Sequence, residues 1–221
     1  VKRVHQELGG KSPNLVLPDA DLATQLPAVA MGPLVNTGQS CISPTKVLVA
    51  KDREAEVVGF YKNMYAATPV GDPMAEGNHL GPVVNKAQFE KVRSLIQSAI
   101  DEGAKLETGW PDLPPNVNRG YYIQPTVFSG VTPDMRIAQE EIFGPVATIM
   151  TYDTLEDGIE LANATEYGLS AAITGDPAKA AAVAGKLRAG MVAINNWGPT
   201  PGAPFGGYKQ SGNGREGGLA G

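Results

Sequence analysis

The sequence is poor in cysteine, in histidine and in positive charge, and each shortage argues against a class of protein. One cysteine in 221 residues rules out an internal disulfide framework and suits a reducing compartment, here the cytoplasm. Two histidines and that cysteine are too few for a metal site, so we expect no metal. Lysine and arginine number 18 against 23 acidic residues, and no basic patch stands out. We therefore expect no nucleic acid partner.

Long apolar runs are also missing. No stretch approaches the roughly 18 apolar residues that a membrane-spanning helix needs, so no membrane association is expected. A hydrophobic fraction of 42% and a charged fraction of 19% are typical of a soluble globular chain. The sequence opens at Val1 without the layout of a signal peptide and closes in a glycine-rich tail. From these ends we expect a segment of a longer protein.

The apolar pattern alternates between strand-like and helix-like segments. Strands are predicted at 14–17, 45–50, 121–130, 146–152, 169–175 and 191–195. Helices are predicted at 20–36, 53–67, 85–104, 154–165 and 176–190. This alternation predicts an α/β fold with a largely parallel sheet. Pro27 and Pro33 predict a kink or break in the first helix, because an interior proline costs about 3 kcal/mol.

The single cysteine lies in the stretch NTGQSCISPTKVLVA, between a glycine turn and a predicted strand. Cys41 is either a buried structural thiol or a nucleophile. Its neighbours are small and polar, unlike those of a core cysteine. Gly38 lets the backbone turn closely and expose its N–H groups. A thiol of ordinary pKa, about 8.5, needs a base or nearby donors to react well at neutral pH.

Two acidic stretches could supply such a base or a ligand. Glu7, in HQELGGKSPN, is either a general base at the mouth of a strand or a solvated carboxylate, and Lys11 is expected on the surface. The stretch QEEIFGPVATI offers one surface acid and one ligand acceptor, or only an ordinary loop before a strand. A hydrolase that uses Cys41 with His5 is possible, but no spacing selects it.

The glycine-rich tail APFGGYKQSGNGREGG is not a phosphate-binding loop, because it lacks that motif's spacing and its strand–turn–helix context. In order along the chain, ELGGKSPN, GQSC, EEIFGPV, NATEYGLSAAI and PFGGYKQSGNGRE together resemble the NAD(P)-dependent aldehyde dehydrogenase superfamily. The resemblance extends over about residues 3–217. It implies a three-layer α/β/α catalytic domain over 8–208, with 1–7 and 209–221 as flanking segments that join a cofactor-binding domain.

The resemblance also implies roles for individual residues. Cys41 matches the family's nucleophile, and Glu7 matches its general base. Glu141 matches the glutamate that contacts the nicotinamide ribose, and Phe143 matches the phenylalanine at the nicotinamide end. The implied reaction oxidises an aldehyde to a carboxylic acid through a Cys41 thiohemiacetal and thioester, and Glu7-activated water hydrolyses the thioester.

Other implications concern scaffold, cofactor and assembly. Asn195, Gly38 and Gly9 match scaffold positions around the family's active site. NAD or NADP is the implied cofactor, a small aldehyde the substrate, and a homo-oligomer the state of the full-length protein. The family's pyrophosphate-side glycine motif and oxyanion-hole asparagine have no match in these 221 residues. Two alternatives therefore stay open, namely cofactor-independent ester hydrolysis by the same cysteine and a non-catalytic or oligomerisation module.

Overall fold

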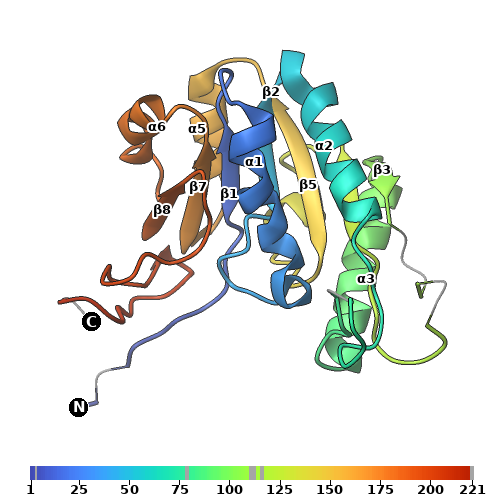
Figure 1. Ribbon diagram of the computed structural model, residues 1–221. Coiled ribbons are helices and arrows are strands. Elements are labelled where there is room, and N and C mark those ends of the chain that lie inside the picture. The colour runs from blue at the N-terminus through green and yellow to red at the C-terminus, as the bar shows by residue number, and fades with distance from the viewer. Residues whose placement is uncertain (3, 78–79, 110–112, 115–116, 220–221) are drawn as a thin grey trace.

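A computed structural model describes residues 1–2, 4–77, 80–109, 113–114 and 117–219, and a seven-stranded sheet runs through its centre (Figure 1). The spatial order of the strands is β3-β4-β5-β2-β1-β7-β8. Their bounds are Pro13–Val16 for β1, Lys46–Ala50 for β2, Lys105–Thr108 for β3, Thr126–Ser129 for β4, Val146–Tyr152 for β5, Ser170–Thr174 for β7 and Met191–Ile194 for β8. Within this sheet the β3–β4 pair is antiparallel, and the other described pairs are parallel. The predicted, largely parallel α/β fold is confirmed.

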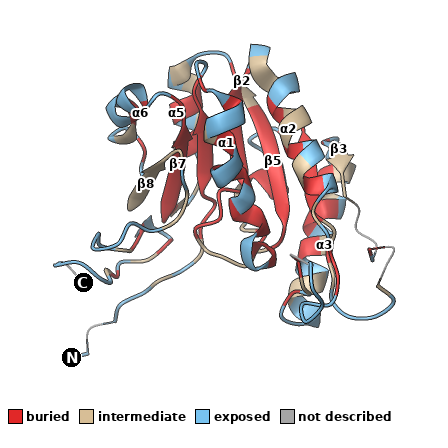
Figure 2. Ribbon diagram, in the orientation of Figure 1, coloured by how far each residue is buried: buried red, intermediate tan, exposed pale blue. Residues whose placement is uncertain are grey.

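Helices cover both faces of this sheet and make the fold three-layered. They are α1 at Leu22–Met31, α2 at Glu54–Ala66, α3 at Lys86–Asp101, α4 at Arg136–Gln139, α5 at Leu155–Asn163 and α6 at Pro177–Ala184. Alternate strand residues point to opposite faces: Val47 and Val49 join the cluster under α1 and α2, whereas Leu48 joins the cluster under α3, α5 and α6. Figure 2 shows the resulting buried sheet between exposed outer helix faces.

Side-chain caps start four of the helices. Asp21 accepts a hydrogen bond from Ala23 N at α1, and Asn85 accepts one from Gln88 N at α3. Thr154 and Asp157 form a reciprocal capping box at α5, and Asp176 precedes Pro177 at the first position of α6. The cap residues of α3, α5 and α6 coincide with the starts that the sequence predicts.

The predicted break in the first helix is wrong at Pro27 and occurs only before Pro33. Helix α1 runs through Pro27, which is exposed, as is Ala23 one turn earlier. The Ala23 carbonyl that proline leaves without a donor therefore faces water, so the loss is small. The helix ends at Met31, and Pro33 lies at the start of the 3₁₀ segment η1, Gly32–Gly38.

Three further features differ from prediction. Strand β4 begins only after Pro125 rather than at residue 121, and it lies between β3 and β5. Helix α6 ends at Ala184, six residues before the predicted glycine stop. The short strands β6, Tyr167–Gly168, and β9, Tyr208–Lys209, pair with each other outside the main sheet. No helix in the described part of the chain has both the length and the apolarity to cross a membrane.

Candidate active site

The predicted site residues precede three neighbouring parallel strands. Glu7 and Gly9 come before β1, Cys41 comes before β2, and Glu141 and Phe143 come before β5. Because β1 and β5 both flank β2 and all three run parallel, these segments meet at the amino-terminal edge of the sheet. The topology therefore gathers residues that are up to 136 positions apart in sequence.

A strained turn carries Cys41 to this edge. Asn36 and Thr37 adopt left-handed backbone conformations with φ of 52° and 56°, and Gly38 continues them with φ of 73°. A Cβ on Gly38 would lie 2.1 Å from the Gly144 carbonyl carbon and oxygen. Only glycine permits this close approach, which presses the cysteine turn against the loop that bears Glu141 and Phe143.

Two glycines after Glu7 join the three segments. A Cβ on Gly10 would lie 2.4 Å from the Cys41 carbonyl oxygen, so the two backbones touch. The Gly10 N–H donates to Glu141 Oε1 at 2.9 Å, and a Cβ on Gly9 would lie 2.5 Å from Glu141 Oε2. The pair Gly9–Gly10 thus packs directly against the nucleophile candidate on one side and the Glu141 carboxylate on the other.

The backbone of Phe143 is held in an unfavourable conformation. Its φ is 56°, a value that a bulky side chain seldom adopts. The Gln88 amide, on α3, donates to the carbonyls of Ile142 at 3.1 Å and of Phe143 at 2.8 Å. These two hydrogen bonds fix the loop, and strain of this kind often occurs where a ligand binds. The Phe143 ring is half-buried.

Glu7 lies between the two flanking segments of the chain. Leu8 N donates to the Ser211 carbonyl at 3.0 Å, and Gly214 N donates to the Gln6 carbonyl at 3.1 Å. Both carboxylate oxygens of Glu7 are enclosed and have no hydrogen-bond partner among the described residues. Burial and the nearby Glu216 carboxylate raise the pKa of Glu7, although the Arg215 guanidinium opposes the shift.

The electrostatics around Cys41 disfavour the thiolate. Burial raises the pKa of the thiol, and the charges of Glu141 and Glu7 raise it further. The backbone N–H groups of Cys41 and Ile42 act in the opposite direction, because they can donate to the sulfur anion. The thiol therefore lies near both carboxylates and near two N–H donors, and it is half-buried.

Lys11 is not on the surface, contrary to the sequence-based expectation. It is 1% exposed, and its Nζ has no hydrogen-bond partner among the described residues. Burial and the neighbouring Lys46 ammonium lower its pKa to about 7, against the pull of Glu141. Lys46, at the head of β2, is also fully buried, and its Nζ donates to the Ala164 carbonyl at 3.3 Å. The apolar strand pattern around Lys46 did not indicate that this lysine side chain is buried.

Asn195 lies at the other end of the sheet from the residues above. It follows β8, its φ is 52°, and its amide both accepts from Gly175 N and donates to Gly175 O at 2.9 Å. These bonds join the carboxyl ends of β7 and β8, whereas the other candidates cluster at the amino ends. The chain then turns, and the Trp197 ring packs against Gly32. A Cβ added to Gly32 would lie 2.9 Å from that ring.

Sequence reasoning missed the two charged residues of the tail that act on Glu7. Arg215 Nη1 donates to the carbonyls of Gly207 at 2.8 Å and Gly214 at 2.7 Å, and its guanidinium lies over the Tyr208 ring. The available signal for their role was that two charged residues, Arg215 and Glu216, stand within a glycine-rich stretch. His79 lies outside the described residues, and within the described ones no three His, Cys, Asp or Glu side chains gather as a metal site would require.

Comparisons with known proteins match nearly the whole chain. A putative aldehyde dehydrogenase from Staphylococcus haemolyticus is 44% identical over 216 residues, which are 97% of this chain and 46% of that protein. A cysteine-to-alanine mutant of Pseudomonas syringae aldehyde dehydrogenase C, solved with NAD+ and octanal, superposes with a TM-score of 0.96 at 48% identity. That match covers 100% of this chain and 46% of the solved one.

A Mycobacterium tuberculosis aldehyde dehydrogenase solved with NAD+ superposes with a TM-score of 0.94 at 42% identity, over 97% of this chain and 44% of the solved one. The chain thus spans about half the length of the relatives that it matches. The family model described as the aldehyde dehydrogenase family matches residues 1–221. The chain belongs to the aldehyde dehydrogenase family.

Proposed function

We propose that the natural protein containing this chain oxidises an aldehyde to a carboxylic acid and transfers a hydride to NAD+ or NADP+. One observation carries the proposal: the Gly9–Gly10 pair, separated from Glu7 by Leu8 alone, touches the Cys41 backbone and hydrogen-bonds the Glu141 carboxylate. A nucleophile, a base and a ribose-binding acid are thus adjacent. A small aldehyde is the proposed substrate, and a homo-oligomeric, cytoplasmic whole protein is the expected state.

Cys41 performs the first step as nucleophile. Because its thiol pKa is raised, attack requires that a base remove the proton, and Glu7, whose own pKa is raised, is suited to accept it. The sulfur then adds to the aldehyde carbonyl to give a thiohemiacetal. The N–H of Cys41 is placed to donate to the oxyanion that develops on the former carbonyl oxygen.

Glu141 and Phe143 are suited to hold the nicotinamide end of the cofactor. Glu141 Oε1 is fixed by Gly10 N–H, whereas Oε2 accepts no hydrogen bond within the described residues and is free to bind ribose hydroxyls. Phe143 follows two residues later on the strained, hydrogen-bonded loop. NAD+ or NADP+ held by these two residues would supply the hydride acceptor for the oxidation. The two solved relatives above bind NAD+, and one also binds octanal.

Glu7 then serves the second step. The acyl group stays on Cys41 as a thioester, and Glu7 releases to solvent the proton that it took from the thiol. The ionised Glu7 then takes a proton from water as that water attacks the thioester carbonyl. The enclosed, unpaired carboxylate of Glu7 has free lone pairs for this water. Collapse of the tetrahedral species releases the carboxylic acid and restores the thiol.

Ester hydrolysis by the same residues is a second candidate. It needs a nucleophile, an N–H donor and a base, and Cys41, its backbone N–H and Glu7 supply all three without any cofactor contact. Such an activity uses the acylation and deacylation steps but not the hydride transfer. The two functions therefore differ in whether product formation depends on NAD+ or NADP+.

The test uses the natural full-length protein that contains this chain. We expect aldehyde-dependent NADH or NADPH formation in the wild type, its complete loss in Cys41→Ala, and near-normal rates in the control Ser98→Ala. Ser98 lies on α3, where its hydroxyl donates to the Leu95 carbonyl. Activity retained in Cys41→Ala contradicts the proposal. Release of nitrophenol from a nitrophenyl ester without NADH formation favours the hydrolase.

A further inference from the structure

We infer that Gln39 is a positioning residue for Cys41. Its side-chain amide ties the turn 36–39, which precedes the cysteine, to the segment 81–84 and so fixes the direction of the thiol. The inference rests on the role of Cys41 as nucleophile that is proposed above. Gln39 acts through the residue that it holds and has no contact of its own with the reacting atoms in this role.

Each polar group of Gln39 makes a hydrogen bond that holds the turn. The backbone N–H donates to the Asn36 carbonyl at 3.1 Å, and Nε2 donates to the same carbonyl at 3.2 Å. In return, Asn36 Nδ2 donates to the Gln39 carbonyl at 3.0 Å. The remaining oxygen, Oε1, accepts from Val84 N at 2.9 Å. One side chain therefore closes the turn and also fastens it to another segment.

The turn needs such support because its backbone is strained. Asn36 and Thr37 have φ of 52° and 56°, and a β-branched residue such as threonine seldom adopts a left-handed conformation. Strain of this kind persists only where surrounding contacts hold it. Without the bonds of Gln39 the turn can relax toward an ordinary conformation. Cys41 would move with it, because Ser40 alone separates the two.

The segment 81–84 is a fixed support. Val83 is 2% exposed, and its N–H donates to the Tyr121 carbonyl at 2.9 Å. Thr37 provides a second tie to this segment, because its buried hydroxyl donates to the Gly81 carbonyl at 3.2 Å. The turn before the cysteine is therefore anchored to a part of the chain that is itself held in place.

The same part of the chain also holds the loop of Phe143, but through a different residue. Helix α3 follows the segment 81–84, and Gln88 in its first turn donates to the carbonyls of Ile142 and Phe143. These bonds do not involve Gln39. Loss of Gln39 should therefore displace the thiol and leave the proposed cofactor contacts in place.

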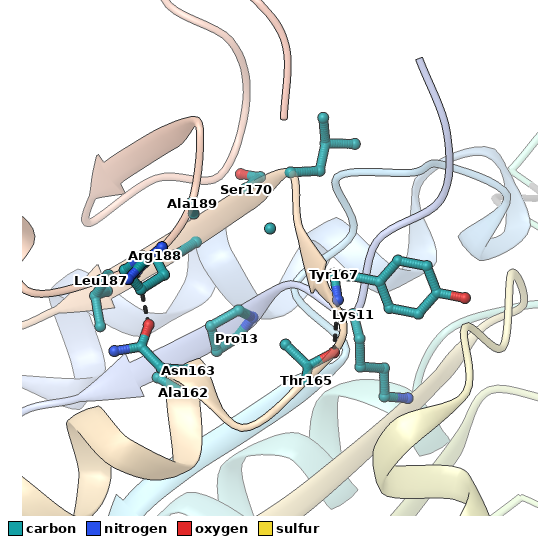
Figure 3. A pocket seen from close by; sticks show the side chains of 13 residues that line it. Lys11, Pro13, Ala162, Asn163, Thr165, Tyr167, Ser170, Leu187, Arg188 and Ala189 are labelled. Carbon is teal, nitrogen blue, oxygen red and sulfur yellow. Dashed lines mark hydrogen bonds between the residues drawn. The ribbon is translucent and has the colours of Figure 1, made fainter. Parts of the chain in front are cut away.

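The β1 side of the cysteine gives the turn no equivalent tie. Gly10 touches the Cys41 carbonyl, but the next side chain, Lys11, lines a cavity with Tyr167 (Figure 3). Within the described chain, the hydrogen bonds from the turn to other segments go to 81–84. The direction of the thiol therefore depends on that support.

The first measurement is alkylation of Cys41 by iodoacetamide across the neutral and alkaline range, in the natural full-length protein without cofactor. In Gln39→Met we expect the midpoint of this pH profile to rise. The N–H groups of Cys41 and Ile42, which lower the thiol pKa, follow the turn and would lose their alignment with the sulfur. Glu7 and Glu141, whose charges raise that pKa, are unchanged in the variant. A general loss of stability would not move the midpoint of the folded protein.

The second measurement is the pre-steady-state rate of NADH formation from aldehyde and NAD+. In Gln39→Met we expect this rate to fall about tenfold or more, because a misplacement of about 1 Å can cost about a hundredfold. The Kd of NADH, from fluorescence titration, should stay within about threefold of wild type, because the Phe143 loop keeps its bonds to Gln88.

Gln97→Met is the matched control. Gln97 is an exposed glutamine of α3, and its Nε2 donates to Asp101 Oδ1 at 2.9 Å, so the same substitution removes an amide hydrogen bond outside the turn. Its alkylation midpoint and NADH rate should equal those of wild type. Thr37→Val covers the case in which Gln39→Met does not fold. It keeps the shape of threonine and loses only the tie to Gly81, so the midpoint should rise by a smaller amount.

The outcomes separate this inference from the proposed function. Wild-type protein that forms no NADH from aldehyde overturns the proposed function, whereas the alkylation profile still decides the role of Gln39. An unchanged midpoint in folded Gln39→Met overturns the positioning role, with or without aldehyde oxidation. If Gln39→Met does not fold, an unchanged midpoint in Thr37→Val overturns it.

Discussion

At the scale of single residues, the proposed mechanism depends on Cys41 and Glu7 acting together. The thiol has a raised pKa because burial, Glu141 and Glu7 disfavour its anion. Glu7 has a raised pKa because it is enclosed near Glu216. A thiol with a raised pKa and a carboxylate with a raised pKa favour proton transfer at the moment of attack over a thiolate that exists beforehand. The two groups are therefore better understood as one unit than as separate residues.

The change Glu7→Gln should separate the two halves of the reaction. Without a base at this position, we expect thioester hydrolysis to slow by about 10²-fold or more. Acylation also loses its proposed proton acceptor, but it should slow less than hydrolysis, because loss of the Glu7 charge also lowers the thiol pKa of Cys41. Stopped-flow absorbance should show a burst of NADH followed by a slow steady state. A steady-state rate equal to that of wild type would refute the role of Glu7 in deacylation.

Residues with short, ordered motifs could be predicted from the sequence, but their surroundings could not. Cys41, Glu7 and Glu141 stand in recognisable motifs, and the structure brings all three to one edge of the sheet. Lys11 was expected at the surface because it follows two glycines, but it is 1% exposed and lines a cavity with Thr165 and Tyr167. Its environment depends on contacts distant in sequence, which no local pattern encodes.

At the scale of elements, glycines set how closely the site segments approach. Gly38→Ala should destabilise the fold by about 1–2 kcal/mol or more, because alanine resists the left-handed φ of 73° and would overlap the Gly144 carbonyl. Gly59→Ala is the control: it lies inside α2 with open space around it, and alanine should stabilise that helix by about 0.5–1 kcal/mol. Urea unfolding measures both. Equal, small effects would contradict the close-approach argument.

A buried acid joins helix α2 to the edge of the sheet. The Glu107 side chain on β3 is 6% exposed, accepts from Ser129 Oγ at 2.7 Å and pairs with Lys105 at 2.8 Å, while Lys62 of α2 lies at 3.8 Å. Burial alone would raise its pKa, but the hydrogen bonds from Lys105 and Ser129 and the charges of both lysines outweigh burial and lower it. The ionised form is thus stabilised by folding.

A lowered folded pKa means that this stabilisation is present above the unfolded pKa, about 4.3, and is lost as pH falls through the folded value. Glu107→Gln should therefore reduce the free energy of unfolding by about 1–3 kcal/mol at pH 7, and by less as the pH is lowered below 4. Chemical denaturation of the wild type and of Glu107→Gln, at pH 7 and below pH 4, checks this prediction. A difference between the two proteins that grows on acidification would show that the sign is wrong.

Elements with strong periodicity or caps could be predicted, whereas marginal ones could not. The amphipathic α3 and the capped α5 start where their side chains indicate. Strand β3 was missed because its four residues are partly exposed at a sheet edge and become a strand only by pairing with β4. The break predicted at Pro27 was wrong because helix propensity does not indicate which face of α1 is exposed to water.

At the scale of the whole molecule, the two flanking segments complete the site together. Leu8 N binds the Ser211 carbonyl, and the Ser211 hydroxyl donates to the Gly9 carbonyl at 2.7 Å, so the tail holds the backbone on either side of the Gly9 contact with Glu141. The position of Glu7 therefore depends on residues more than 200 positions away. A domain limited to 8–208 would lack both Glu7 and this support, so the proposed mechanism requires the flanking segments 1–7 and 209–221 as well.

The 221-residue chain expressed by itself should not oxidise aldehydes, even when folded. Its described residues offer the cofactor the Glu141 carboxylate and the Phe143 ring, and the chain matches only 46% of its solved P. syringae relative. Nothing in the sequence resembles a glycine-rich turn for the pyrophosphate, where charge-assisted contacts are worth about 1.5–3 kcal/mol each. Losing several such contacts weakens binding by orders of magnitude, because about 1.4 kcal/mol is tenfold.

Calorimetry of this chain with NAD+ and with NADP+ provides the measurement, beside an assay for aldehyde-dependent NADH formation. We expect no binding at micromolar concentrations and no NADH, while a nitrophenyl ester still acylates Cys41 because that step needs only the thiol, its N–H donors and Glu7. The Cys41→Ala chain is the control for acylation. Micromolar affinity together with NADH formation would mean that the amino edge of this sheet, without a pyrophosphate site, suffices to hold the cofactor.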